Sequence, residues 1–357
     1  MTNSLPCRYR QLDQVLKGGM GEVIVCQDLN LDRKVAIKFI QDDNDTSRLT
    51  DEIQAMCKLH QDIRSKHIVQ IFDVILDEEN RRPGIVQEYI EGEDLVSRVL
   101  TQELSKNEYI KILYQIISGI SDIHEKDLIH RDIKPNNIKF DAANLIKIFD
   151  FGLTRTENQN NSTMGFKGTT LFAAPELYSS GFVHFTKAID IYAFGVTARY
   201  IAGLELDESF SKIPPSTSPK PSFKEVTFEL SNDITNILDQ TLAFNPQDRP
   251  SAQTIKDVLK KHLLFGKHRA LLTSNGRTEV ISKDKSSVNL NIDNVGSLTI
   301  QYNGLDFVVA HYAGNITVNR NSIRVNQLLP NNCVITFEGD HSRTFITFDI
   351  SNPEVVL

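Results

Sequence analysis

The chain has 357 residues, of which 40% are hydrophobic and 24% are charged, and its formal net charge is −7. This length suits one large domain or two ordinary ones, and the composition is that of a soluble globular protein. No apolar run approaches the roughly 20 residues that a membrane-spanning helix needs, and no leader peptide is visible, so we expect a cytoplasmic protein. The acidic balance argues against a nucleic-acid partner, and the four scattered cysteines are expected to be free thiols.

The first ninety residues predict a β-rich region with one helix. Two β-branched runs, residues 23–25 and 35–37, flank a polar turn and predict a hairpin. Apolar residues then recur at helical spacing over residues 49–59, and this helix would carry Glu52. A further short strand is expected at residues 85–87.

Beyond residue 90 the pattern becomes helical. An apolar stripe runs from Tyr109 to Ile123 at helical spacing, and residues 189–201 are apolar almost all round, which indicates a helix buried at the centre of a lobe. The Pro-rich stretch 214–221 is interpreted as an internal loop, because helical patterning resumes at Ile234. A small β-rich lobe followed by a larger helical lobe gives an α+β fold class.

From about residue 275 the pattern changes to short strands separated by polar or Gly-containing turns. The runs are residues 288–292, 298–300, 307–309, 316–318, 323–325, 334–337 and 345–348. Seven such runs predict a small all-β sandwich or barrel. We therefore expect a main domain at 9–265, a linker at 266–274 and a β-rich accessory domain at 275–357.

The most informative motif lies at residues 130–137 and is followed, thirteen residues after Asn137, by the triplet Asp-Phe-Gly at 150–152. Asp132 is placed to accept a proton from a hydroxyl, and Lys134 to neutralise charge on a transferring phosphoryl group. The oxygen atoms of Asn137 and Asp150 suit Mg²⁺, which also keeps waters and nucleotide phosphates as ligands. This arrangement serves the transfer of a phosphoryl group from a metal-bound nucleotide to a hydroxyl.

With these motifs the chain resembles the Ser/Thr protein kinase family, and most closely its eukaryotic-like bacterial members. Further landmarks follow in the family's order: a glycine-rich loop at 17–23, the run 35–38 ending in Lys38, then Glu52, the triplet Ala-Pro-Glu at 174–176, Asp190 and Arg249. The likeness covers residues 9–265. It implies the two-lobed kinase fold, ATP with Mg²⁺ (or Mn²⁺) as cofactors, protein hydroxyls as substrates, and autophosphorylation.

The resemblance also assigns the nucleotide site. Lys38 would contact the α and β phosphates, and Glu52 would hold Lys38 in place. The residues expected to bind the nucleotide are Leu16, Gly18, Gly19, Gly21, Val23, Ala36, Lys38, Glu88, Tyr89, Ile90 and Asp94. Asp94 is expected either to reach a ribose hydroxyl or to be an exposed acid in a turn.

Two residues depart from the family pattern. Leu16 stands where the first glycine of the loop is usual, and its side chain should weaken nucleotide affinity. Lys139 stands where an apolar residue usually lies beneath the adenine. Either the stem of Lys139 lies flat there, or its neighbour Ile138 or Phe140 supplies the packing.

In the family, the arginine before the catalytic aspartate helps to gather a phosphate on the activation segment, so Arg131 and Arg155 are expected to do so. The candidate acceptors are Thr154, Thr156, Ser162, Thr163, Thr169 and Thr170. Ser162 and Thr163 are favoured because they lie in a polar stretch, whereas Thr169 is expected to contact the catalytic aspartate. Glu176 is expected to pair with Arg249, and Asp190 to brace the backbone of the catalytic loop.

Two alternatives remain open. A pseudokinase that serves as a scaffold would keep the fold without the reaction; Leu16 and Lys139 favour it, and the intact catalytic set opposes it. A small-molecule kinase would lack the peptide-docking segment that residues 174–176 supply. The β-rich domain is expected to contact either the kinase part or a partner.

Overall fold

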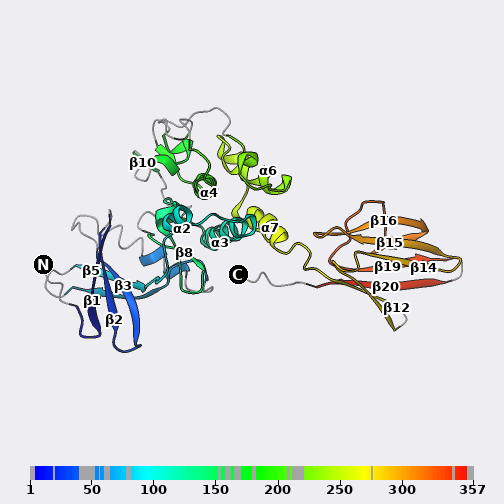
Figure 1. The fold of residues 1–357 in the computed structure, drawn as a ribbon, viewed down its shortest axis with the longest axis horizontal. Helices are drawn as coiled ribbons and strands as arrows, with labels where there is room; N and C mark the ends of the chain where they lie inside the picture. Colours follow the sequence, from blue (N-terminus) through cyan, green and yellow to red (C-terminus); the bar gives the residue numbers. More distant parts are fainter. Residues whose placement is uncertain are drawn as a thin grey trace. The chain divides into compact units, whose positions relative to one another are not determined.

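The computed structural model describes residues 5–18, 21–39, 53–55, 57–59, 65–77, 82–151, 154–156, 162–164, 170–178, 182–206, 210, 221–274, 276–339 and 342–351. The chain divides into two compact units, Met1–Leu259 and Lys260–Leu357. Figure 1 traces the first unit from a β-sheet in blue to helices in cyan, green and yellow. None of the helices within the described ranges is long and apolar enough to cross a membrane.

A five-stranded antiparallel sheet opens the first unit (Figure 1). In sheet order its strands are β1 (Tyr9–Gly18), β2 (Gly21–Asp28), β3 (Arg33–Phe39), β5 (Pro83–Glu88) and β4 (Ile71–Leu76). Asp28 lies opposite Arg33, which closes the predicted hairpin between β2 and β3. One face of the sheet buries a cluster that includes Ile24, Ile37 and Val86. β-Branched side chains fit this pleated surface, so the local sequence and the packing agree.

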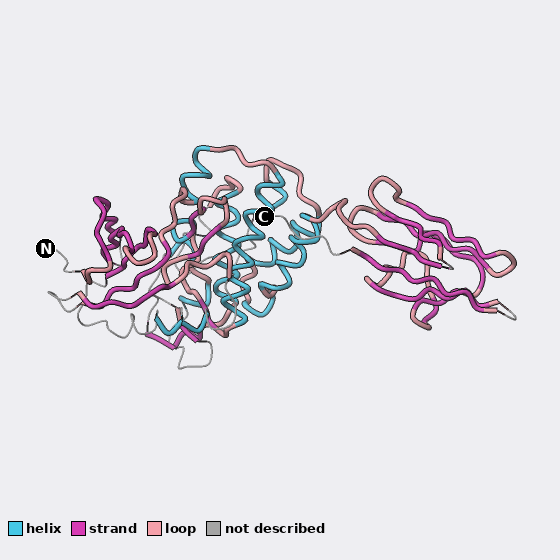
Figure 2. Tube along the Cα trace, turned by 90° about the horizontal axis from the view of Figure 1, so that it is seen from below, coloured by secondary structure: helices cyan, strands magenta, loops and turns pink. Residues whose placement is uncertain are grey.

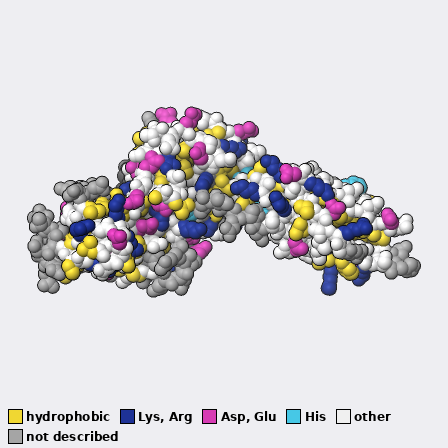
Figure 3. Space-filling view, turned by 60° about the horizontal axis from the view of Figure 1, so that its bottom comes forward, with side chains coloured by type: hydrophobic (Ala, Val, Ile, Leu, Met, Phe, Trp, Pro, Cys, Tyr) yellow, Lys and Arg dark blue, Asp and Glu magenta, His cyan; other side chains and the backbone are white. Residues whose placement is uncertain are grey.

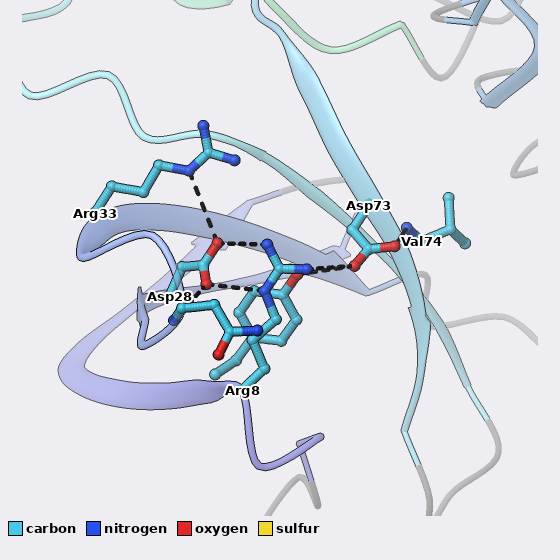
Figure 4. Close-up of polar contacts among 7 residues, drawn as sticks. Arg8, Asp28, Arg33, Asp73 and Val74 are labelled. Carbon is cyan, nitrogen blue, oxygen red and sulfur yellow. Dashed lines mark hydrogen bonds and ion pairs between the residues drawn. The ribbon is translucent and has the colours of Figure 1, made fainter.

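A buried carboxylate ties the start of the chain to this sheet (Figure 4). Asp28 is fully buried, and its two oxygens accept hydrogen bonds from the Arg8 guanidinium at 2.8 and 2.7 Å. Arg8 also contacts Asp73 on β4 at 3.2 Å, and the Tyr9 hydroxyl donates to the same carboxylate at 3.0 Å. The Arg8 hydrogen bonds lower the pKa of Asp28, so the carboxylate stays ionised. The chain entering β1 is thereby fixed to two other strands.

The predicted helix over residues 49–59 is confirmed where the structure describes it. Residues 53–55 and 57–59 are helical, and Ala55 and Leu59 pack in a buried cluster with Phe151. Glu52, which this helix was expected to present, lies outside the described residues.

After the sheet, the first unit is mainly helical in its regular structure (Figure 2, cyan). They are α2 (Leu95–Thr101), α3 (Lys106–Glu125), α4 (Ala188–Ile201), α6 (Asn232–Thr241) and α7 (Ala252–Leu263). Helix α3 begins with a capping box: the Ser105 hydroxyl accepts from the Glu108 N–H at 3.3 Å, and the Glu108 carboxylate accepts from the Ser105 N–H at 3.0 Å. The prediction of a central buried helix is confirmed by α4, whose residues are almost all buried.

Short elements connect the helices and shape the site. The paired strands are β6 (Leu128–Ile129) with β9 (Arg155–Thr156), β7 (Ile138–Phe140) with β8 (Ile146–Ile148), and β10 (Ser162–Met164) with β11 (Phe182–His184). The 3₁₀ turns are η1 (Pro135–Asn137), η2 (Thr170–Phe172), η3 (Pro175–Tyr178), η4 (Phe223–Glu225) and η5 (Pro246–Asp248).

His67 lies in the segment before β4, and its hydrogen bonds link this segment to β8. Its Nδ1 lies 3.1 Å from the Ile146 carbonyl, and its own carbonyl accepts from the Ile148 N–H at 2.9 Å. The side chain is buried, and burial lowers the pKa of His67 to about 4. The ring is therefore neutral in the folded protein at pH values where an unfolded chain would already protonate it.

This difference predicts acid sensitivity. The unfolded state takes up a proton below the ordinary histidine pKa of about 6.5 while the folded state does not, so the stability that depends on neutral His67 is lost as the pH falls. We expect His67 to account for about 2 kcal/mol of the loss in unfolding free energy between pH 7 and pH 5. Urea unfolding of the wild type and His67→Gln at both pH values measures the difference. Equal pH dependence in the two proteins would contradict it.

The second unit is a sandwich of two antiparallel sheets (Figures 1 and 2). In sheet order the larger contains β13 (Arg277–Ile281), β12 (Ala270–Ser274), β20 (Arg343–Ile350), β19 (Asn332–Glu338), β17 (Ile316–Val318) and β18 (Asn321–Ser322). The smaller contains β14 (Ser287–Ile292), β15 (Gly296–Tyr302) and β16 (Phe307–Gly314). One cluster of buried side chains draws on both sheets, including Leu298 and Val309 from the smaller and Phe337 from the larger.

Two sequence predictions about this unit were wrong. Residues 270–274 were assigned to the linker, but they form β12, which pairs with both β13 and β20. Residues 323–325 were expected to form a strand, but the strand is Asn321–Ser322 and Ile323 is buried after it. In both places short apolar runs fit a strand and a loop equally well, and only the pairing partners decide between them.

Candidate active site

The catalytic-loop motif lies between β6 and β7 and is anchored to α4. Asp190 on α4 accepts hydrogen bonds from the backbone N–H groups of His130 and Arg131, both at 2.8 Å. His124 Nε2 lies 3.0 Å from the same carboxylate. Burial opposes ionisation of Asp190, but the hydrogen bond and charge of His124 outweigh it, and the pKa of Asp190 is lowered. The predicted brace between this residue and the loop is confirmed.

Asp132 is held by two other residues of the motif. It is 5% exposed, and its Oδ2 accepts from Lys134 Nζ at 2.8 Å and from Asn137 Nδ2 at 2.9 Å. Asn137 Nδ2 also donates to the Asp132 backbone carbonyl at 2.9 Å. The sequence placed these three side chains in one site, and the structure brings them into direct contact. These bonds fix the orientation of the Asp132 carboxylate.

Asp150 contacts the lysine of β3. Lys38 Nζ lies 2.7 Å from Asp150 Oδ1, and both residues are largely buried. Burial alone would raise the pKa of Asp150, but the charge and hydrogen bond of Lys38 outweigh it, so the pKa is lowered. Asp150 and Arg131 also adopt left-handed backbone conformations, with φ of 67° and 70°, which are uncommon for residues other than glycine.

The donor set fits a divalent metal ion. The amide nitrogen of Asn137 donates to Asp132, which leaves the amide oxygen as the group free to coordinate. The backbone carbonyl of Asn137 accepts from the Phe149 N–H at 3.1 Å, so Asn137 is tied to the residue that precedes Asp150. An ionised carboxylate and an amide oxygen are ligands that Mg²⁺ accepts together with phosphate oxygens.

Those of the expected nucleotide-binding residues that the structure describes lie on β1, β2, β3, at the end of β5 and between β5 and α2. Gly18 lies opposite Gly21 and Leu16 opposite Val23 in the β1–β2 pairing, and Gly19 lies outside the described residues. Ala36 is buried on β3, opposite Gln87. Glu88 is the last residue of β5, and Tyr89 and Ile90 follow it; their contact with a nucleotide stays a prediction.

Leu16 provides a test of this assignment. We expect a side chain at this position to obstruct the close approach of the loop backbone to phosphates, which glycine would allow. We expect Leu16→Gly to tighten Mg-ATP binding by about fivefold, or roughly 1 kcal/mol. Isothermal titration of the wild type, Leu16→Ala and Leu16→Gly should give affinities in that rising order. Unchanged affinity in Leu16→Gly would exclude the steric effect.

The sequence allowed two roles for Asp94 and two ways of packing beneath the adenine around Lys139, and the structure bears on both. Asp94 is the N-cap of α2, and its two carboxylate oxygens accept from the backbone N–H and the hydroxyl of Ser97 at 2.8 and 2.9 Å. Lys139 is half-buried, whereas Ile138 and Phe140 are buried on the other face of β7. Strand alternation therefore excludes these two neighbours from the face that Lys139 occupies.

Comparison with known proteins agrees with this geometry. Residues 9–262 match the protein kinase domain family. The chain belongs to this family. It is similar to the Ser/Thr protein kinase PrkC of Bacillus subtilis, with 36% identity over 53% of this chain and 29% of the relative.

Two further relatives extend the likeness over most of the kinase domain. The mitogen-activated protein kinase spk1 of Schizosaccharomyces pombe is 28% identical over 70% of this chain and 77% of its own length. The Ser/Thr protein kinase pkn3 of Myxococcus xanthus is 28% identical over 71% of this chain and 49% of its own length. The chain thus spans less than a third of the first relative and about half of the third.

The activation segment of the kinase domain is described in part. Pairing of β6 with β9 places Arg155 opposite Ile129, two residues before Arg131. The Arg131 guanidinium lies 3.6 Å from the centre of the Phe185 ring. The binding of a phosphate on the activation segment by Arg131 and Arg155 stays a prediction.

The candidate acceptors differ in their surroundings. Ser162 and Thr163 lie on β10, opposite His184 and Val183 of β11. Thr154 is buried, which does not suit a phosphate acceptor, and Thr169 lies outside the described residues. That Ser162 or Thr163 accepts the phosphate stays a prediction.

An ion pair anchors the end of the activation segment. The Arg249 guanidinium donates to both carboxylate oxygens of Glu176, at 2.7 and 2.8 Å. Arg249 also donates to three backbone carbonyls, those of Ala243, Ala188 and Phe244. The predicted pair is confirmed, and its arginine has nearly all of its donors in use.

Sequence reasoning missed Lys147. This buried lysine on β8 contacts the Glu88 carboxylate at 3.0 Å, and the same carboxylate accepts from the Gln70 N–H at 3.2 Å. A charged residue between two isoleucines in an otherwise apolar strand was the available signal, because a buried lysine requires an acid nearby.

Proposed function

We propose that this chain is a Ser/Thr protein kinase that transfers the γ-phosphoryl group of Mg-ATP to protein hydroxyls, including its own. The observation that carries the proposal is the Asp132 carboxylate, held by Lys134 and Asn137 in the same loop. A positioned carboxylate next to a cation suits the activation of a hydroxyl and the neutralisation of a transferring phosphoryl group. The family supports the reaction, and two of the relatives are named Ser/Thr protein kinases.

In this mechanism each group has one task. Asp132 orients the substrate hydroxyl and accepts its proton, while Lys134 offsets negative charge on the phosphoryl group in flight. Lys38 contacts the α and β phosphates, with Glu52 as its expected partner on the preceding helix. Asn137 and Asp150 would hold Mg²⁺, which would supply positive charge to offset that of the nucleotide phosphates.

The peptide substrate would dock on the segment that ends at Glu176. Ala174 and Leu177 are buried there, and the Arg249–Glu176 pair fixes the segment to the helical lobe. This fixed floor favours a protein substrate over a small molecule.

Phosphorylation of Ser162 or Thr163 is proposed to raise activity, with Arg131 and Arg155 binding the phosphate group. The β-sandwich unit is proposed to target or restrain the kinase domain.

On the face shown in Figure 3, basic and acidic side chains lie interspersed over the first unit. A protein substrate can be recognised by such a mixed surface through local charge complementarity, with no long basic stripe required. This feature is in keeping with protein partners.

The test is direct. Purified full-length protein is incubated with γ-labelled ATP and Mg²⁺, with and without a generic protein substrate, and modified residues are mapped by mass spectrometry. We expect label on serine and threonine only, dependent on Mg²⁺. ATP binding without transfer to any hydroxyl would instead favour the scaffold interpretation, to which Leu16 and Lys139 point.

A further inference from the structure

Two lysines face each other on the β7–β8 ribbon. Lys139 lies directly opposite Lys147 in the antiparallel pairing, so both side chains leave the same face. Like charges in this position repel, and each ammonium therefore needs a compensating group. Lys147 has one, because the Glu88 carboxylate lies 3.0 Å away. Glu88 ends β5, so this face of the ribbon is turned toward the segment expected to hold adenine.

Among the described residues Lys139 has no such partner. It makes no ion pair there, and its ammonium lies 5.9 Å from the centre of the Phe149 ring. The Lys139 backbone forms an isolated antiparallel bridge with Asp94. Hydrogen bonds from Ser97 chiefly lower the pKa of Asp94, and the charge of Lys139 adds to this effect. Lys139 is thus a half-buried cation close to Asp94, and no hydrogen bond among the described residues uses the N–H donors of its ammonium.

The carboxylate of Asp94 is already used to cap helix α2. Each of its carboxylate oxygens already accepts a hydrogen bond from Ser97 at the start of α2. Diverting one of them to a ligand would weaken the helix cap. The Lys139 ammonium, in contrast, takes part in no hydrogen bond or ion pair among the residues that the structure describes.

We propose that Lys139 donates a hydrogen bond to a ribose hydroxyl of the bound nucleotide and makes the site selective for ribonucleotides. This inference rests on the proposed function, which places adenine beside residues 88–90 and the phosphates beside Lys38 and Asp150. The sugar would then lie between them, and Lys139 is bridged through its backbone to Asp94, the residue expected near the ribose. An ammonium only donates and a hydroxyl oxygen can accept, so the pairing is chemically matched.

The experiment measures dissociation constants of Mg-ATP and its 2′-deoxy and 3′-deoxy analogues on the full-length chain. We expect the wild type to bind one analogue about tenfold more weakly than ATP, the effect of one lost hydrogen bond. Lys139→Met, of similar length and without charge, should bind ATP and that analogue equally. The matched control is Lys224→Met, at an exposed lysine outside the site, which should keep the wild-type ratio.

A second variant separates the two candidate ribose ligands. Asp94→Ser keeps a capping side chain and should keep the preference for ribose. Loss of the preference in Asp94→Ser, its persistence in Lys139→Met, or its absence from the wild type would each overturn the inference alone. A chain that bound none of the nucleotides would overturn the proposed function as well.

Discussion

Replacement of Asp132 by asparagine is expected to lower the rate of phosphoryl transfer by about a thousandfold, the range that positioned general bases contribute. The variant keeps the shape of the side chain and an oxygen that can accept from Lys134 and Asn137, so the loop should keep its geometry. It loses the ability to take a proton. Nucleotide affinity should stay within about twofold, because the side-chain oxygen of the new asparagine can keep the hydrogen bond from Asn137 and so keep Asn137 in place.

Single-turnover transfer and ATP titration on the same preparation measure the two quantities. The control is Asp233→Asn, which makes the same chemical change on an exposed residue of α6 and should leave transfer unaffected. Wild-type transfer in Asp132→Asn would place the base elsewhere and remove the observation on which the function rests.

Replacement of Glu176 by alanine is expected to destabilise the kinase domain by roughly 3–5 kcal/mol, because it leaves the buried Arg249 charge without its partner. The melting temperature should fall by about 10 °C. Transfer should also decline, since the segment carrying Ala174 and Leu177 loses its anchor to the helical lobe.

A double-mutant cycle identifies the cause. Arg249→Met combined with Glu176→Gln removes both charges, and it should be less destabilised than the sum of the two single variants. As a control, Glu91→Ala breaks the exposed pair with Lys34, where water compensates both charges, and should change stability little. Additive effects in the cycle would show that packing, and not the ion pair, holds the segment.

The site could be predicted from sequence where function depends on fixed spacing. Asp132, Lys134 and Asn137 lie within six residues, so local chain geometry brings them together whatever surrounds them. The contact between Lys38 and Asp150 joins residues 112 apart in sequence, and it required the resemblance to a known fold to be anticipated as a shared site.

Other features depended on tertiary choices that the sequence leaves open. Asp94 fits a helix cap or a ligand contact equally well until α2 is seen to start there. Residues 270–274 read as a linker because their role depends on β20, more than seventy positions later. Helices α3 and α4 were predictable, since their periodicity is long and their burial follows from it.

The buried contact between Lys147 and Glu88 has a mechanical consequence. Lys147 lies three residues before Asp150, and its side chain is 7% exposed, so it cannot leave Glu88 without stranding a charge away from water. In the proposed site, this contact joins the floor beneath adenine to the segment that leads to the proposed metal ligand Asp150. An incoming nucleotide would find this floor already assembled, and none of its binding energy would be diverted to ordering it.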